Sequence, residues 1–147
     1  MDFQDSLRIA SENPLCTLAT VEASQPRVRP LVMIHADETG FYFQTHAAKA
    51  LVRQLEADNR VEVCFLASGP KNRPILVLRV AGETEFITDL NEKRRVCKNR
   101  LDIINQVYGI DGLDDPRIVV FRIKTGEAYL WTPEYNLCES KLKRIRF

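Results

Sequence analysis

The sequence predicts a mainly β protein with peripheral helices, built as a small barrel or a strongly curved sheet. At least six segments are rich in β-branched and aromatic residues and are separated by turn-forming residues. Helical periodicity is confined to a few short stretches. In addition, Gly82 lies in the middle of a long extended segment, where a glycine suits a bulge or a barrel corner better than a flat sheet.

Length and composition indicate a single domain over residues 1–147. A chain of 147 residues with 45% hydrophobic and 28% charged side chains is typical of a globular protein with one core. The 21 basic and 20 acidic residues nearly cancel, so the charge gives no reason to expect a nucleic-acid partner. No apolar run is long enough to span a membrane, and acidic residues stand where a signal peptide would be basic. We therefore expect a cytoplasmic protein without a membrane contact.

The N-terminal half combines short extended segments with two helices. Phe3, Leu7 and Ala10 recur at helical spacing, and Pro14 ends this first helix. A second helix follows the third strand, because the apolar residues at positions 48, 51, 52 and 55 share one helical face. The loop ADETG has hairpin length, which predicts antiparallel pairing of the second and third strands. The four predicted strands are residues 15–21, 27–35, 40–45 and 60–67.

The C-terminal half contains two long extended segments with a helix between them. Residues 75–87 follow the loop 68–74, and the helix begins near Asn91 and ends at the run GIDGLDDP. The apolar stripe of this helix consists of Cys97, Leu101, Ile104 and Tyr108. In the last segment, 117–132, Gly126 allows either one bulged strand or a hairpin. The basic end SKLKRIRF is interpreted as a solvated terminal strand or tail.

Familiar catalytic and metal-binding patterns are missing from the sequence. His35 and His46 lack metal-ligand spacing, and there is no P-loop, no G-x-S-x-G motif and no marked nucleophilic cysteine. The four cysteines are scattered singly, so neither a zinc site nor a disulfide framework is expected. The catalytic residues are therefore unknown at this stage, and no metal ligand is assigned.

Cations and hydroxyls gather where the third strand meets the second helix. Lys49 lies in the first turn of that predicted helix, where the helix dipole disfavours a cation, and Thr45 is placed to cap it. A bound phosphate would make Lys49 favourable, because free N–H groups at a helix N-terminus bind anions. A screened lysine that points into water is an equal alternative. On the strand 27–35, a period of two predicts one face that carries two arginines. The members of this face are Arg27, Arg29, Leu31, Met33 and His35.

The runs QPRVRPLVMI and FYFQTHAAKALVRQLEADNRVEVCF resemble the FMN-binding split barrel of the pyridoxamine 5'-phosphate oxidase-like family, in particular its small nitroimidazole-reductase-like members. The resemblance implies a homodimer with FMN in clefts at the subunit interface, and a flavin-dependent oxidoreductase that acts on a small molecule. It implies that Arg29, Lys49 and Thr45 bind the phosphate and that Trp131 comes from the partner subunit. The other implied site residues are Pro30, Leu31 and Val32, through their backbone, and Gln44.

The sequence also departs from the full-length oxidases. Val77 stands where they carry a glutamine, and HAA replaces a longer segment before the lysine. Their arginine-bearing C-terminal segment has no counterpart, so the resemblance does not extend to pyridoxamine phosphate oxidation. Trp131 is equally well explained as an aromatic side chain that fills the barrel edge. The alternatives to an FMN enzyme are the same barrel with a deazaflavin or heme, a non-catalytic flavin carrier or sensor, and a cofactor-free interaction module.

Overall fold

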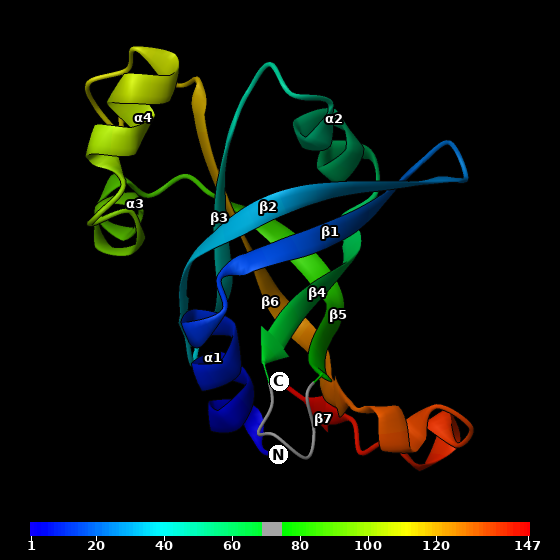
Figure 1. Ribbon diagram of the computed structural model, residues 1–147. Helices are drawn as coiled ribbons and strands as arrows, with labels where there is room; N and C mark the ends of the chain where they lie inside the picture. Colours follow the sequence, from blue (N-terminus) through cyan, green and yellow to red (C-terminus); the bar gives the residue numbers. More distant parts are fainter. Residues whose placement is uncertain (69–74) are drawn as a thin grey trace.

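The computed structural model describes residues 1–68 and 75–147, so the predicted loop 68–74 lies almost wholly outside the described residues (Figure 1). The strands are β1 (Leu15–Glu22), β2 (Gln25–Asp37), β3 (Gly40–His46), β4 (Arg60–Ser68), β5 (Ile75–Ile87), β6 (Ile118–Trp131) and β7 (Ile145–Arg146). The helices are α1 (Phe3–Glu12), α2 (Ala50–Ala57), α3 (Leu90–Val96) and α4 (Leu101–Tyr108), and the 3₁₀ turns are η1 (Pro133–Tyr135) and η2 (Glu139–Lys141). Among the described residues, no helix has the length and apolar character needed to cross a bilayer.

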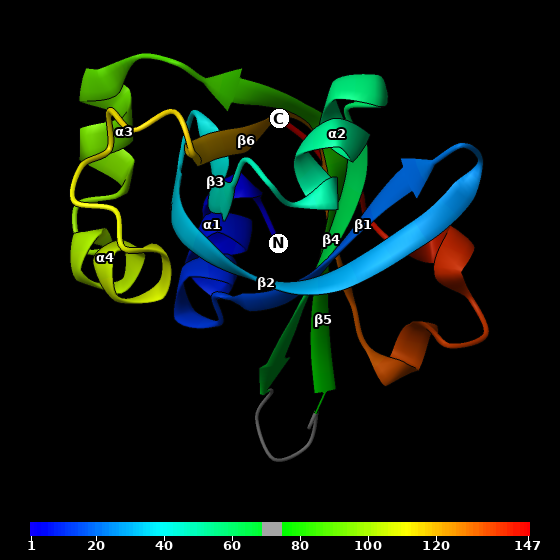
Figure 2. The ribbon, with the colours of Figure 1, turned by 90° about the horizontal axis from the view of Figure 1, so that it is seen from above.

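The strands close into a barrel. Their order is β3-β2-β1-β4-β5-β6-β7, and an additional pairing of β3 with β6 joins the two sides of the sheet. Figure 2 shows the resulting ring of strands from above, with α2 over its mouth and α3 and α4 outside it. The predicted fold class, a mainly β barrel with peripheral helices, is therefore confirmed.

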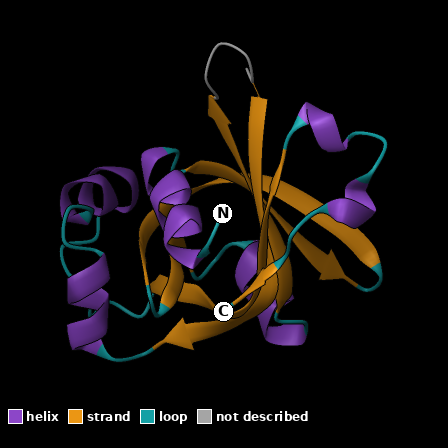
Figure 3. Cartoon of the chain, turned by 90° about the horizontal axis from the view of Figure 1, so that it is seen from below, coloured by secondary structure: helices purple, strands orange, loops and turns teal. Residues whose placement is uncertain are grey.

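Helices α1 and α2 cover the two ends of the barrel (Figure 1). Leu7 of α1 and Leu55 of α2 belong to one core cluster with the inward-facing residues of the strands. Both chain termini lie at the α1 end, as the view from below shows (Figure 3). There the ring of Phe147 stacks on that of Phe3 with centroids 4.8 Å apart. The basic C-terminal end thus contains a short terminal strand, β7, and ends in an aromatic anchor.

Helices α3 and α4 cover the outer face of β3 and β6. The single helix predicted from Asn91 to Tyr108 is wrong, because a turn at residues 97–100 divides it. One straight helix of that length would extend about 27 Å and could not follow a curved sheet. The turn lets Cys97 and Ile104, both fully buried, pack in the same outer cluster as Tyr42 of β3.

A β-bulge at Ile34 changes the face pattern predicted for β2. Met33 pairs with Phe43, whereas His35 already pairs with Tyr42, so Ile34 is an extra residue. Met33 is buried in the barrel core. The ring of His35 instead lies 5.7 Å from that of Tyr42, on the outer face. The predicted common face is therefore correct as far as Met33 and wrong for His35.

Two glycines let β5 and β6 approach closely. Gly82 pairs with Gly126, and a Cβ at Gly126 would lie 2.0 Å from the carbonyl oxygen of Ala81. A register shift nearby leaves Lys124 as an extra residue of β6. The segment predicted at 117–132 is thus one bulged strand and not a hairpin, and the bulge predicted around Gly82 is present.

Candidate cofactor site

Part of β2 has an open edge. The strand pairs with β1 over Gln25–Val32 but with β3 only over Met33–Asp37, so its first part has a neighbour on one side only. Pro30 lies in this part, and proline is tolerated at such edges because it has no N–H to donate. The carbonyl oxygen of Pro30 and the backbone groups of Val32 point away from β1 and have no partner strand there, whereas Leu31 faces β1 and its carbonyl oxygen accepts from the thiol of Cys16 at 3.2 Å.

Arg29 projects from this strand toward α2. Its guanidinium donates to Thr20 Oγ1 at 2.7 Å and to Gln54 Oε1 at 2.5 Å. Burial lowers the pKa of Arg29, which nevertheless remains a cation. Arg29 forms no direct ion pair with any described residue: the atoms that it contacts are neutral oxygens, and the carboxylate of Glu22 attracts it only over a longer distance.

Gln54 is a site residue that the sequence reasoning missed. Only 4% of it is exposed. Its Oε1 also accepts from Thr20 Oγ1 at 2.7 Å, and its amide donates to Glu22 at 3.2 Å. The only local signal is a polar residue directly before the apolar Leu55 of a short helix. This position in the sequence does not indicate that Gln54 bonds to Arg29.

Lys49 lies at the N-terminus of α2, one position outside the helix. The predicted place of Lys49 in the first turn of the helix is wrong, because Lys49 is the N-cap residue with extended backbone angles. The backbone N–H of Ala48 donates to Nδ1 of His46 at 3.1 Å, and this turn delays the helix. The ammonium of Lys49 lies 5.8 Å from the ring centroid of Tyr108. It forms no ion pair within the described part of the chain. The attraction between the ammonium and the Tyr108 ring offsets part of the repulsion between the ammonium and the helix dipole.

Thr45 does not cap α2, contrary to the prediction. It belongs to β3, pairs with Val119 and is 1% exposed. Its Oγ1 is buried and has no hydrogen-bond partner among the described residues. Buried hydroxyls normally have a partner. The orphaned Oγ1 is therefore compatible with a bound group that completes its hydrogen bonding.

Gln44 lies on the other face of β3 from Thr45, and Trp131 lies far from the two cations. The amide of Gln44 donates to the carbonyl oxygen of Thr45 at 3.1 Å. Trp131 ends β6, whose first residue, Ile118, pairs with His46. A strand of 14 residues extends over about 43 Å, so Trp131 is far from the end of β3. Within one chain, Trp131 cannot share a site with Arg29 or Lys49.

Trp131 instead belongs to an apolar surface on the outside of the barrel. The strand register places Leu15 beside Val32, Leu66 beside Val77, and Val77 beside Trp131. Leu15 and Leu66 are each 67% exposed, which is unusual for leucines on neighbouring strands. A cavity of ≈ 360 Å³ borders this surface, lined by Cys64, Val77, Arg79, Trp131, Asn136 and Glu139.

The largest charged cluster has a structural role. Arg95 of α3 donates to Asp37 at 2.6 Å, to Glu92 at 2.8 Å and to the hydroxyl of Tyr42 at 3.2 Å. The hydrogen bond from Arg95 is the main cause that lowers the pKa of Glu92 to about 2. His35 also bonds to Asp37, so the cluster ties the β2–β3 hairpin to α3. In the described parts of the chain, no group of three or more His, Cys, Asp or Glu side chains could hold a metal ion.

Comparisons with known proteins agree with this architecture. A NimC/NimA family protein from Clostridium acetobutylicum has a TM-score of 0.76 at 20% identity, covering 98% of this chain and 92% of that chain. An FAD-binding protein from Mesorhizobium loti has a TM-score of 0.68 at 20% identity, with coverages of 88% and 94%. A heme binding protein from Mycobacterium smegmatis has a TM-score of 0.70 at 15% identity, with coverages of 95% and 55%. At these identities the likeness shows a shared fold.

Sequence comparison shows the family itself. No curated protein matches the chain. The family described as pyridoxamine 5'-phosphate oxidase matches residues 4–132, which span the helix α1 and the barrel strands β1 to β6. This chain therefore belongs to the pyridoxamine 5'-phosphate oxidase family.

Proposed function

We propose that the chain binds FMN at the open edge of β2 and acts as a flavin-dependent oxidoreductase on a small molecule. The observation that carries this proposal is a pair of cations without an acidic partner in the described residues: the partly buried Arg29 and Lys49 at the N-terminus of α2. A phosphate dianion would pair with both cations. The buried hydroxyl of Thr45 is available for a further hydrogen bond.

Arg29 and Lys49 lie at different positions along the axis of α2. Lys49 precedes the helix, whereas Arg29 bonds to Gln54, five residues further along, which corresponds to about 7.5 Å along the axis. In the structure Arg29 bonds to Thr20 and Gln54 while Lys49 lies against Tyr108, so a phosphate that pairs with both would draw the Lys49 ammonium from Tyr108 toward the first turns of α2. Gln54 would then act as a positioning residue that keeps Arg29 directed toward the helix.

The flavin would supply the redox chemistry, and the chain's own residues would bind and orient it. The carbonyl oxygen of Pro30 and the backbone groups of Val32 would bind the flavin along the open edge of β2, while Leu31, whose backbone faces β1, would contact it through its side chain. Helix α2 lies over the mouth of the barrel (Figure 2) and would shield the bound group from water at that end. We assign no side chain as a general acid or base, because hydride or electron transfer does not require one.

The proposed active form is a homodimer. The barrel core is filled with side chains, so a flavin ring needs a second wall outside one subunit. The exposed surface around Leu15, Leu66 and Trp131 is a suitable apolar interface. Stable dimers of this kind bury more than about 2,000 Å² in total. Such a dimer would bring Trp131 of the partner subunit toward the flavin.

Titration with FMN and riboflavin tests the phosphate site. Arg29→Ala or Lys49→Ala should weaken FMN binding roughly ten- to a hundred-fold, since each removes a charge-assisted hydrogen bond, while riboflavin affinity stays nearly constant. Added phosphate should compete with FMN. Arg53→Ala is the matched control, because Arg53 is an exposed cation of the same helix. Equal affinities of the unmodified protein for riboflavin and FMN would reject the site.

Spectroscopy separates the alternatives. The absorption spectrum of the purified protein distinguishes FMN from a deazaflavin or a heme, and a protein with no bound chromophore would favour an interaction module. Turnover with a reduced nicotinamide then separates an enzyme from a flavin carrier or sensor. Trp131 is the only tryptophan, so its emission should fall on FMN binding if it lies beside the ring. Unchanged emission would remove Trp131 from the site.

A further inference from the structure

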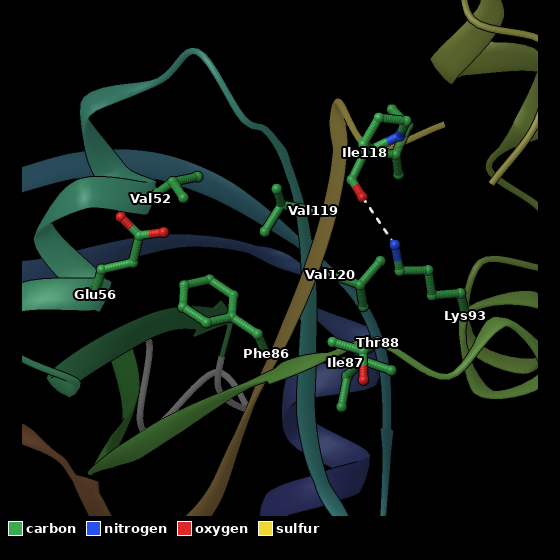
Figure 4. A pocket seen from close by; sticks show the side chains of 10 residues that line it. Val52, Glu56, Phe86, Ile87, Thr88, Lys93, Ile118, Val119 and Val120 are labelled. Carbon is green, nitrogen blue, oxygen red and sulfur yellow. Dashed lines mark hydrogen bonds between the residues drawn. The ribbon is translucent and has the colours of Figure 1, made fainter. Parts of the chain in front are cut away.

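We propose that a second cavity, between α2, β5 and β6, binds a small organic molecule with one positive charge and an apolar body. Its volume of ≈ 320 Å³ lies at the lower end of the range for ligand sites. Figure 4 shows the cavity with α2 on one side and the first part of β6 on the other. The residues that matter for recognition are Val52, Glu56, Phe86, Lys93, Ile118 and Val119.

This cavity is separate from the cations proposed to bind phosphate. Val52 and Glu56 are one helical turn apart and line the cavity from the same flank of α2. Gln54 lies two residues from each of them, which turns its side chain by about 160° around the helix axis, to nearly the opposite side. Its bond to Arg29 therefore lies on the opposite flank of α2. The second cavity can be filled whether or not a flavin is bound.

A free carboxylate and a free aromatic face meet in the cavity. Glu56 forms no hydrogen bond or ion pair with a described residue, and it lines the cavity together with Phe86, with its carboxylate on the side of Val52 (Figure 4). Phe86 is 37% exposed, whereas the other six phenylalanines are buried or half-buried. A carboxylate next to an aromatic ring is a favourable site for an ammonium group, which gains from both the charge and the ring. Neither group has another evident role in the fold.

The opposite wall sets the orientation of the ligand. The ammonium of Lys93 donates to the carbonyl oxygen of Ile118 at 3.0 Å, which holds a positive charge at that side (Figure 4). The wall between the two ends is apolar and includes Val119 and the fully buried Val120. A ligand must therefore place its cationic nitrogen at Glu56 and a neutral or anionic end toward Lys93. A molecule with positive charges at both ends would be repelled.

The test compares 2-phenylethylammonium with its neutral analogue 2-phenylethanol on the protein as purified. Calorimetry should show the ammonium binding roughly ten-fold more tightly, and amide NMR shifts should cluster at Phe86 and Val119. Glu56→Gln should weaken only the ammonium, roughly two- to five-fold, and Glu38→Gln, at another exposed carboxylate, should change neither affinity. Phe86→Leu keeps an apolar wall and should weaken the ammonium more than the alcohol.

Three results would overturn the proposal. Equal binding of the ammonium and the alcohol would show that charge is not recognised. Amide shifts outside the cavity, or an ammonium affinity insensitive to Glu56→Gln, would show that the cation binds elsewhere. Arg29→Ala should leave ammonium binding intact, so failure here and failure of the FMN proposal are distinguishable.

Discussion

Gln54→Leu should destabilise the fold, although leucine is the more apolar residue and the side chain is buried. The amide oxygen of Gln54 accepts from Thr20 at 2.7 Å and from Arg29 at 2.5 Å. Leucine cannot accept a hydrogen bond. The substitution therefore leaves the hydroxyl of Thr20 without its acceptor and removes one of the acceptors of Arg29, which keeps its bond to Thr20 Oγ1.

The expected loss follows from these two bonds. A hydrogen bond to a charged group contributes about 1.5 to 3 kcal/mol, and a buried hydroxyl without a partner costs about 1 to 3 kcal/mol. Burial of the leucine side chain recovers about 1.5 to 3 kcal/mol. At the midpoints of these ranges the net loss is about 2 kcal/mol, and we expect an effect of about 1 to 3 kcal/mol. For a chain of this size, that lowers Tm by roughly 3 to 10 °C.

Thermal unfolding followed by circular dichroism measures this difference. Gln4→Leu is the matched control, because Gln4 is an exposed residue of the other end-capping helix, α1, and leucine has a similar helix propensity. If Gln54→Leu and Gln4→Leu change Tm by the same amount within about 2 °C, the hydrogen bonds of Gln54 with Thr20 and Arg29 do not stabilise the fold as argued.

Three further predictions concern the barrel corner, acid stability and assembly. A Cβ at Gly82 would lie 2.2 Å from the carbonyl oxygen of Thr125, so Gly82→Ala should cost at least about 1 to 3 kcal/mol in urea unfolding; a neutral effect would argue against the close strand crossing. The pKa of Glu92 is lowered from 4.5 to about 2, mainly by its hydrogen bond from Arg95, so this contribution to stability is present above pH 4.5 and is lost as the pH falls toward 2. Glu92→Gln should flatten the stability profile in that window, and an unchanged profile would contradict the assignment. If the proposed dimer forms through the surface around Leu66, Leu66→Arg should yield monomers in sedimentation velocity; a dimer that persists would place its interface on another surface.

Local patterns in the sequence determined most of the elements. The helix predicted at residues 3–12 is α1, and the segments predicted at 40–45 and 75–87 differ from β3 and β5 by at most one residue. Their boundaries depend on neighbouring residues, such as Pro14 after α1 and the loop before Gly40. The fold class followed, because many short strands with few helices have few ways to bury their apolar faces.

Tertiary contacts decided the details that local patterns missed. The start of α2 depends on the side chain of His46, which accepts from the turn and postpones the helix. The bulge at Ile34 and the turn that divides α3 from α4 follow the curvature of the closed barrel, which no short window of sequence encodes.

For the candidate site, the sequence alone determined that Arg29 and Lys49 stand near the strand-to-helix junction. It did not determine that Gln54 would hold Arg29, or that Trp131 would lie at the far end of β6. Only the tertiary structure decided these relations. The partner of a polar side chain depends on strand register and on where a crossing helix lands, and both are set by packing between segments distant in the chain.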